Sequence, residues 1–176
     1  MTFSDAAGGS VPARPRTLHM PTGETITVVR SGADTAGRAM EIEAVLPPRL
    51  GGPPPHRHRR ETETFEVLEG VLRARVGDVT RDLVAGESLT VAPWTLHGFS
   101  NPTDDTTRLR VMETPAGPLE EQFRALAAAG RFPPLVRLAR INVAHGLSYH
   151  LHGVPDPVQR ALWRALAALP IPRRRT

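Results

Sequence analysis

Short segments in which apolar and polar residues alternate, separated by turn residues, fill the chain from residue 25 to residue 114. In residues 39–46 (AMEIEAVL), Met40, Ile42, Ala44 and Leu46 fall on one face, while Glu41 and Glu43 fall on the other. Segments of this kind occupy residues 25–30, 39–46, 63–69, 71–76, 79–84, 88–92 and 107–113. Strands of about five residues, repeated with turns between them, predict a mainly β fold built as an antiparallel sandwich or barrel.

Two turns are predicted where glycine interrupts this pattern. We expect Gly70 to form a hairpin turn between segments 63–69 and 71–76, and residues 85–87 to form a second turn. The chain has 18 prolines and 15 glycines in 176 residues. This content agrees with a chain of many turns and short strands.

The two ends of the chain follow other patterns. Residues 1–21 are rich in small residues and proline, and we interpret them as a flexible arm that precedes a β-barrel at 22–115. Residues 116–176 form a predicted helical extension. Its first two helices should end at Gly130 and Gly146, and a third should begin with Asp156 as N-cap and Pro157 in the first turn.

Composition excludes several classes of chemistry. The chain has no cysteine, and all 22 of its basic residues are arginines, so a disulfide, a thiolate site and a lysine Schiff base are all ruled out. The arginines are interspersed with acids, the net charge is +4, and only eight residues are aromatic (5 Phe, 2 Trp, 1 Tyr), which argues against nucleic-acid binding. No apolar run could span a membrane and the first residues lack a signal peptide's apolar stretch, so we expect a cytoplasmic protein.

Two histidines with one arginine between them stand out in the segment PPPHRHRRETETFEVLEG. In an extended chain His56 and His58 point to the same side, and Glu63 shares a face with Phe65 in the next strand. A carboxylate buried among apolar residues needs a cation. His97 offers a third imidazole, and three nitrogens with one oxygen suit a divalent first-row metal. The alternative is a barrel with a vestigial site that binds no metal.

The spacing of these residues resembles the first motif of the cupin superfamily, G-x5-H-x-H-x(3,4)-E-x6-G. His56, His58, Glu63 and Gly70 match that motif, while its leading glycine is shifted by one position, to Gly51.

The second cupin motif, G-x5-P-x-G-x2-H-x3-N, is similar to the segment that runs from Gly86 to Asn101 and contains His97. Ala92 stands in place of the motif's proline, and Trp94 in place of its internal glycine. The resemblance covers residues 25–113. It implies a single cupin double-stranded β-helix, with the helical extension outside it.

The resemblance also implies a ligand set and a range of activities. His56, His58, Glu63 and His97 would hold one divalent metal (Fe, Mn, Ni, Zn or Cu), and Glu63 could double as a catalytic base. The quercetinase-like branch keeps these four ligands and uses O2, which would make the protein a dioxygenase for a small hydrophobic enol, polyketide-like or flavonol-like substrate. A cyclase, isomerase or lyase without redox change and a non-catalytic ligand-binding cupin are the alternatives.

Four further residues are candidates for a substrate pocket: Met40, Phe65, Trp94 and Phe99. For Trp94, a loop over the pocket and simple surface packing are equally open; for the other three, a place in the barrel core is the alternative.

The remaining histidines and the tail carry weaker signals. His150 and His152 repeat the H-x-H spacing, but no glutamate follows, so we expect no second metal site there. The apolar stripe of the last helix, with Leu162 and Leu166, must be buried. It could cover the barrel, cap its mouth, lie on a membrane surface or form the contact of a homodimer, the oligomer that we expect.

Overall fold

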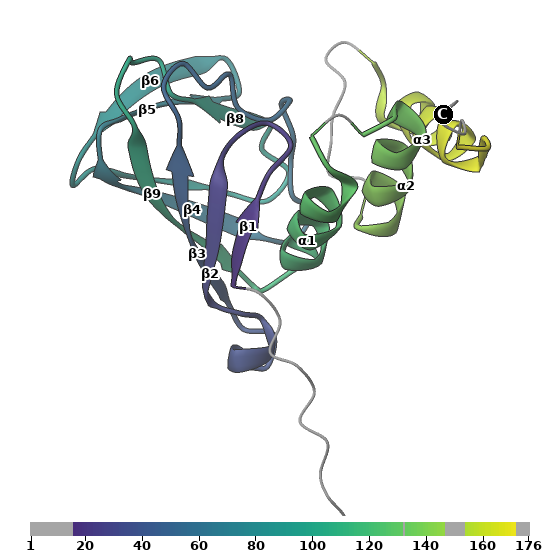
Figure 1. The fold of residues 1–176 in the computed structure, drawn as a ribbon, viewed down its shortest axis with the longest axis horizontal. Coiled ribbons are helices and arrows are strands. Elements are labelled where there is room, and N and C mark those ends of the chain that lie inside the picture. The colour runs from purple at the N-terminus through teal and green to yellow at the C-terminus, as the bar shows by residue number, and fades with distance from the viewer. Residues whose placement is uncertain (1–15, 132, 147–153, 172–176) are drawn as a thin grey trace, which may run out of the picture.

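The computed structural model describes residues 16–131, 133–146 and 154–171 (Figure 1). Most of the predicted flexible arm, and the pair His150 and His152, lie outside the described residues.

Two antiparallel sheets make up the β part of the chain (Figure 1). The larger sheet has the strand order β1 (Thr17–His19), β2 (Thr25–Arg30), β3 (Met40–Leu46), β9 (Thr107–Thr114), β4 (Thr62–Glu69) and β7 (Ser88–Val91). The smaller sheet has the order β6 (Val79–Val84), β5 (Val71–Val76) and β8 (His97–Ser100). The mainly β prediction is confirmed.

The core lies between the two sheets and is filled by the inward residues of the alternating strands. In β3 the burial alternates along the strand as the sequence predicted: Met40, Ile42, Ala44 and Leu46 are buried, the two glutamates are partly exposed and Val45 is exposed. Leu46, Leu72, Leu83 and Leu109 have no exposed surface. Apolar burial of this kind is the main stabilising contribution to such a sandwich.

The predicted hairpin at Gly70 is wrong. The strands on either side of it, β4 and β5, belong to different sheets, so Gly70 is the corner where the chain crosses between them. Its φ is +80°, and a Cβ there would lie 2.7 Å from the carbonyl oxygen of Thr106. The hairpin instead follows β5, where Gly77 joins it to β6.

The start of the β domain also differs from the prediction. Residues 17–19, assigned to the flexible arm, form β1 and pair with β2 in the larger sheet. Leu18 and Met20 are buried in the core. A three-residue strand in a polar context carries too little alternation to be recognised from sequence.

One short 3-10 helix, η1 (Ala33–Thr35), follows β2, and three α-helices follow β9: α1 (Leu119–Ala129), α2 (Leu135–Ala144) and α3 (Asp156–Ala168). Gly130 ends α1 as predicted, whereas α2 ends at Ala144, before His145 and Gly146. Pro155, not Asp156, is the N-cap of α3. Among the described residues, no helix is long and apolar enough to cross a membrane.

The three α-helices lie together at one side of the barrel. α1 packs beside β1, and α2 and α3 pack on each other beyond it (Figure 1). An ion pair between Arg57 and Asp156 connects the start of α3 to the segment that carries His56 and His58. The helices are therefore held against the part of the barrel that bears the candidate ligands.

Candidate metal centre

The structure brings together the four side chains predicted as metal ligands. One ligand atom from each of His56, His58, Glu63 and His97 lies within 4.8 Å of the others, and all four residues are buried. Glu63 projects inward from β4 and His97 from β8. The backbones of His56 and His97 form a reciprocal pair of hydrogen bonds of 2.9 Å each, which joins the two sequence motifs directly.

Backbone carbonyls fix the orientation of two of the imidazoles. Nδ1 of His56 donates to the carbonyl oxygen of Pro54 (3.1 Å), and Nδ1 of His97 donates to that of Thr95 (2.9 Å). When Nδ1 carries the proton of a neutral ring, Nε2 is the atom that can bind a metal. Metal-binding histidines are usually oriented by such a hydrogen bond from the other ring nitrogen.

The donor set itself calls for a cation. Nε2 of His97 lies 2.8 Å from Oε2 of Glu63, and Nε2 of His58 lies 3.3 Å from the same oxygen. Lone pairs that face each other at these distances repel unless a proton or a metal ion lies between them. Three imidazole nitrogens and one carboxylate oxygen fit a divalent first-row metal.

The electrostatics of the cluster favour the forms that bind metal. Burial, followed by the charge of His97, lowers the pKa of His56 to about 3, so this imidazole is neutral. Burial alone would raise the pKa of Glu63, but its contacts with His58 and His97 outweigh burial and hold that pKa well below its usual range. Burial alone would lower the pKa of His58, but the negative charges of Glu63 and then Glu113 outweigh burial and raise that pKa.

Sequence reasoning missed a second buried carboxylate, Glu113. It has no exposed surface, and its Oε1 lies 3.9 Å from Nδ1 of His58. Oε2 accepts a hydrogen bond of 3.2 Å from the backbone N–H of Gly117, while Oε1 has no hydrogen-bond partner in the described part of the chain. Burial raises the pKa of Glu113 to about 7. Glu61 also lies within 4.8 Å of this carboxylate and His58.

A signal for Glu113 was present in the sequence. In the segment TRLRVMET, Leu109, Val111 and Glu113 share one face, so the alternation places a carboxylate on the buried side of the strand. A buried glutamate at the end of an apolar face is a candidate functional group in the same way as Glu63.

A cavity of about 240 Å³ opens beside the cluster of His56, His58, Glu63 and His97. Its barrel side includes His56, His58, Glu63, Phe65 and Phe99, so two of the predicted pocket residues line it. Its other side is formed by helix side chains from α1, α2 and α3, namely Leu119, Gln122, Phe123, Leu126, Leu138 and Trp163. The helical extension therefore closes the mouth of the barrel over the candidate ligands.

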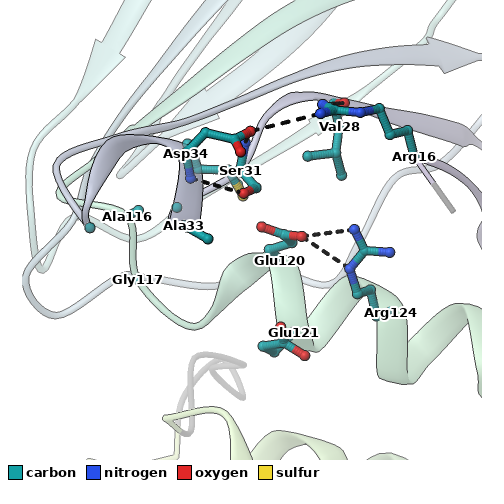
Figure 2. A pocket seen from close by; sticks show the side chains of 13 residues that line it. Arg16, Val28, Ser31, Ala33, Asp34, Ala116, Gly117, Glu120, Glu121 and Arg124 are labelled. Atoms are coloured by element: carbon teal, nitrogen blue, oxygen red, sulfur yellow. Dashed lines mark hydrogen bonds and ion pairs between the residues drawn. The ribbon is translucent and has the colours of Figure 1, made fainter. Parts of the chain in front are cut away.

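The other two predicted pocket residues lie elsewhere. Met40 is not among the residues that line this cavity; it lines a separate pocket of about 470 Å³ between η1 and the start of α1. Charged side chains pair with one another in that second pocket: Arg124 with Glu120, and Arg16 with Asp34 (Figure 2).

Trp94 is half exposed and lies outside the cavity as well. Its ring lies 5.6 Å from the guanidinium carbons of both Arg57 and Arg59, which is within cation–π range. Its φ is +65°, the left-handed region, at the position where the cupin motif has glycine. The backbone N–H of Trp94 donates to the carbonyl oxygen of His58 (2.7 Å). The strained turn at Trp94 therefore holds the backbone of the segment that carries His56 and His58.

Comparison with known proteins agrees with this architecture. Residues 42–113 match the family model described as "Cupin domain". A solved RmlC-like cupin from Shewanella frigidimarina superimposes with a TM-score of 0.51 at 22% identity, over 63% of this chain and 93% of that one. The protein has a cupin fold.

Part of the chain is also similar to a curated protein. The chain is 34% identical over 116 residues to "H2HPP isomerase" of Bacillus subtilis, a match that covers 60% of this chain and 48% of the relative. The chain thus spans about half the length of that relative. The solved polyketide cyclase RemF from Streptomyces resistomycificus is 25% identical, with a TM-score of 0.47 over 57% of this cupin and 68% of that chain.

Proposed function

We propose that this cupin is a metal-dependent isomerase that moves a proton within a small, largely apolar substrate bearing a carbonyl or enol oxygen. The observation that carries the proposal is a buried set of three imidazoles and one carboxylate that opens into a mainly apolar cavity. The 34% identity to a protein named an isomerase supports proton transfer over oxidation by O2.

The four ligands have distinct roles in this proposal. His56, His58, Glu63 and His97 would hold the ion, and a bound divalent metal polarises a carbonyl oxygen and so acidifies the neighbouring C–H bond. The apolar lining excludes water from the substrate and strengthens electrostatic interactions within the cavity. Phe65 and Phe99, whose ring centroids lie 5.5 Å apart with their planes tilted by 58°, supply two aromatic rings to that lining.

Proton transfer also requires a base that is not already engaged. Glu63 is in contact with two imidazoles, which suits a ligand better than a base. Glu24 is the other carboxylate that lines the cavity; it is buried, and its Oε2 has no hydrogen-bond partner among the described residues. In the proposed reaction Glu24 takes a proton from the carbon beside the carbonyl and returns it to another carbon, so no oxidant is consumed.

The test is hydrogen exchange into a model ketone. Phenylacetone in D2O should exchange its benzylic protons faster with Zn(II)-loaded protein than without protein, under anaerobic conditions, and a chelator should abolish the effect. Exchange or turnover that requires both O2 and a redox-active metal would support the dioxygenase instead. Binding of metal with no exchange under any condition would favour a ligand-binding cupin.

Two variants separate the roles of the carboxylates. Glu24→Gln should keep the metal and lower the exchange rate by about 10²- to 10⁴-fold, the usual contribution of a general base. Glu63→Gln should instead lose metal. Metal content measured beside the rate distinguishes the two, and full activity of Glu24→Gln would overturn its role as the base.

A further inference from the structure

Trp163 of α3 lines the cavity beside the candidate metal ligands, and its indole N–H is a buried polar group. The residue is buried at 9% exposure and lines the cavity, yet its Nε1 has no hydrogen-bond partner in the described part of the chain. A buried N–H that lacks an acceptor loses its hydrogen bonds to water and gains none in return, which destabilises the folded protein. Buried tryptophans usually place this group on a partner, so the orphaned donor requires an explanation.

The position of Trp163 is held by contacts outside the cavity. Asp156, at the start of the same helix, pairs with Arg57, which lies between two of the candidate ligands in sequence. Arg140 of α2 donates to the carbonyl oxygens of Ala167 and Leu169 at the end of α3 (2.9 and 2.8 Å). The helix is thus fixed near both of its ends, and the indole is held at the cavity by this framework.

The other helix side chains at the cavity are mostly apolar. Phe123 and Leu126 of α1 and Leu138 of α2 line it beside Trp163. A ligand that fills this space must therefore have an apolar body, and its oxygen atoms would find few donors on this side of the cavity.

We propose that Trp163 is a specificity-determining residue, whose indole N–H donates a hydrogen bond to an oxygen of the substrate. The ligand class is an apolar molecule, about the size of one ring with a short side chain, that carries an accepting oxygen. The inference rests on the proposed function only in taking this cavity as the substrate site. The helical extension is then part of the recognition surface and not an appendage of the barrel.

The first test compares two probes that differ in one oxygen. Phenylacetone has an accepting carbonyl, and isobutylbenzene has the same skeleton with a methyl group in place of that oxygen. Zn(II)-loaded wild-type protein should prefer the ketone, and Trp163→Phe should reduce this preference about five- to tenfold, the loss of one net hydrogen bond. The metal is present in both proteins, so its own affinity for the ketone cancels in the comparison.

A matched control uses the neighbouring residue. Leu162 lies on the same helix, is 44% exposed and is not among the cavity-lining residues, so Leu162→Ala should leave the preference unchanged. An unchanged preference in Trp163→Phe, with metal content and melting temperature at the wild-type level, would overturn the proposal. So would an equal loss of preference in Leu162→Ala.

The second test needs no substitution in the cavity. The chain has two tryptophans, so the NMR spectrum of the Zn(II)-loaded protein should contain two indole N–H signals. Phenylacetone should move the Trp163 signal downfield and leave that of Trp94 unchanged, because Trp94 lies outside the cavity. Binding of the ketone without a shift at Trp163 would overturn the hydrogen bond. If Trp163 responds but no proton exchange occurs, the recognition role stands and the isomerase proposal falls.

Discussion

Glu63 and Glu113 lie directly opposite each other on neighbouring strands, β4 and β9, and both are buried. Their chemistry differs because their neighbours differ. Two imidazoles contact Glu63 and hold its pKa well below the usual range, so it is a carboxylate anion. Glu113 has one backbone donor and a distant imidazole, and burial raises its pKa to about 7. Two residues of one type at one register position therefore supply a carboxylate anion and a carboxyl group that is about half protonated at pH 7.

His58 is the residue that joins these two environments. Its Nε2 faces Glu63 at 3.3 Å and its Nδ1 faces Glu113 at 3.9 Å. A neutral imidazole can carry a proton on only one nitrogen, so the two carboxylates compete to decide which nitrogen that is. A proton on Nδ1, directed to Glu113, leaves Nε2 free to bind a metal.

The largest effect should follow from removing His58 itself. His58→Ala removes a ligand and leaves Glu63 with one imidazole fewer to offset its buried charge, so metal content should fall from about one ion per chain to near zero. Metal analysis of protein purified without chelator measures this. His19→Ala is the control, because His19 is exposed and far from the cluster in the sequence. Full metal content in His58→Ala would refute the assigned site.

The grouping of His56, His58 and Glu63 could be predicted from sequence because these residues are close together in the chain. The H-x-H spacing places two imidazoles on one side of an extended segment, and the alternation in the next strand places Glu63 inward. His97 was proposed from sequence as a third imidazole, and the motif resemblance supported it. Its pairing with His56 spans 41 positions (97 − 56), and no local pattern reveals that contact.

The features that sequence missed depend on how distant segments meet. The alternation puts Glu113 on the buried face, but its register opposite Glu63 follows from the sheet order β9 next to β4. The prediction that the last helix buries the stripe with Leu162 is wrong, because Leu162 is 44% exposed and α3 buries Trp163 instead. Trp163 reaches the cavity because α3 packs on α2 and its start pairs with Arg57, contacts that no local pattern reveals. Gly70 was interpreted as a hairpin because sequence cannot distinguish a turn within one sheet from a corner between two.

The second prediction concerns stability without metal. The pKa of Glu113 is raised from 4.5 to about 7, so between these pH values the unfolded chain loses a proton that the folded chain keeps. The contribution of Glu113 to the free energy of unfolding therefore falls as pH rises through this window, and this contribution is lost fully only above pH 7. His56, with its pKa lowered to about 3, acts in the opposite direction up to pH 6.5, so the wild-type curve alone mixes the two.

Glu113→Gln isolates the contribution of this carboxyl. The free energy of unfolding of the variant, relative to wild type, should rise by about 3 kcal/mol between pH 4.5 and pH 7.5 in metal-free protein. Urea denaturation at several pH values measures the difference. Glu66→Gln serves as the control, because Glu66 is partly exposed on the same strand as Glu63 and should give a much flatter difference. A difference that is constant with pH would show that Glu113 ionises in the folded state as it does in the unfolded one.

The smallest expected effect is on metal affinity, and it tests the link through His58. Above pH 7 Glu113 is ionised and favours the proton on Nδ1 of His58, which leaves Nε2 as the ligand atom. Glu113→Gln removes this charge, so the affinity for Zn(II) at pH 8 should fall about tenfold. Losing a group that orients a metal-binding histidine typically lowers metal affinity by about 10- to 100-fold. We expect the lower end because the 3.9 Å between Glu113 and His58 is longer than a hydrogen bond. At pH 6 wild-type Glu113 is largely protonated and resembles glutamine, so the two proteins should bind Zn(II) nearly equally. Competition with a chromophoric chelator at both pH values gives the two ratios. An equal loss at pH 6 and pH 8 would mean that the substitution acts through packing and not through the charge on Glu113.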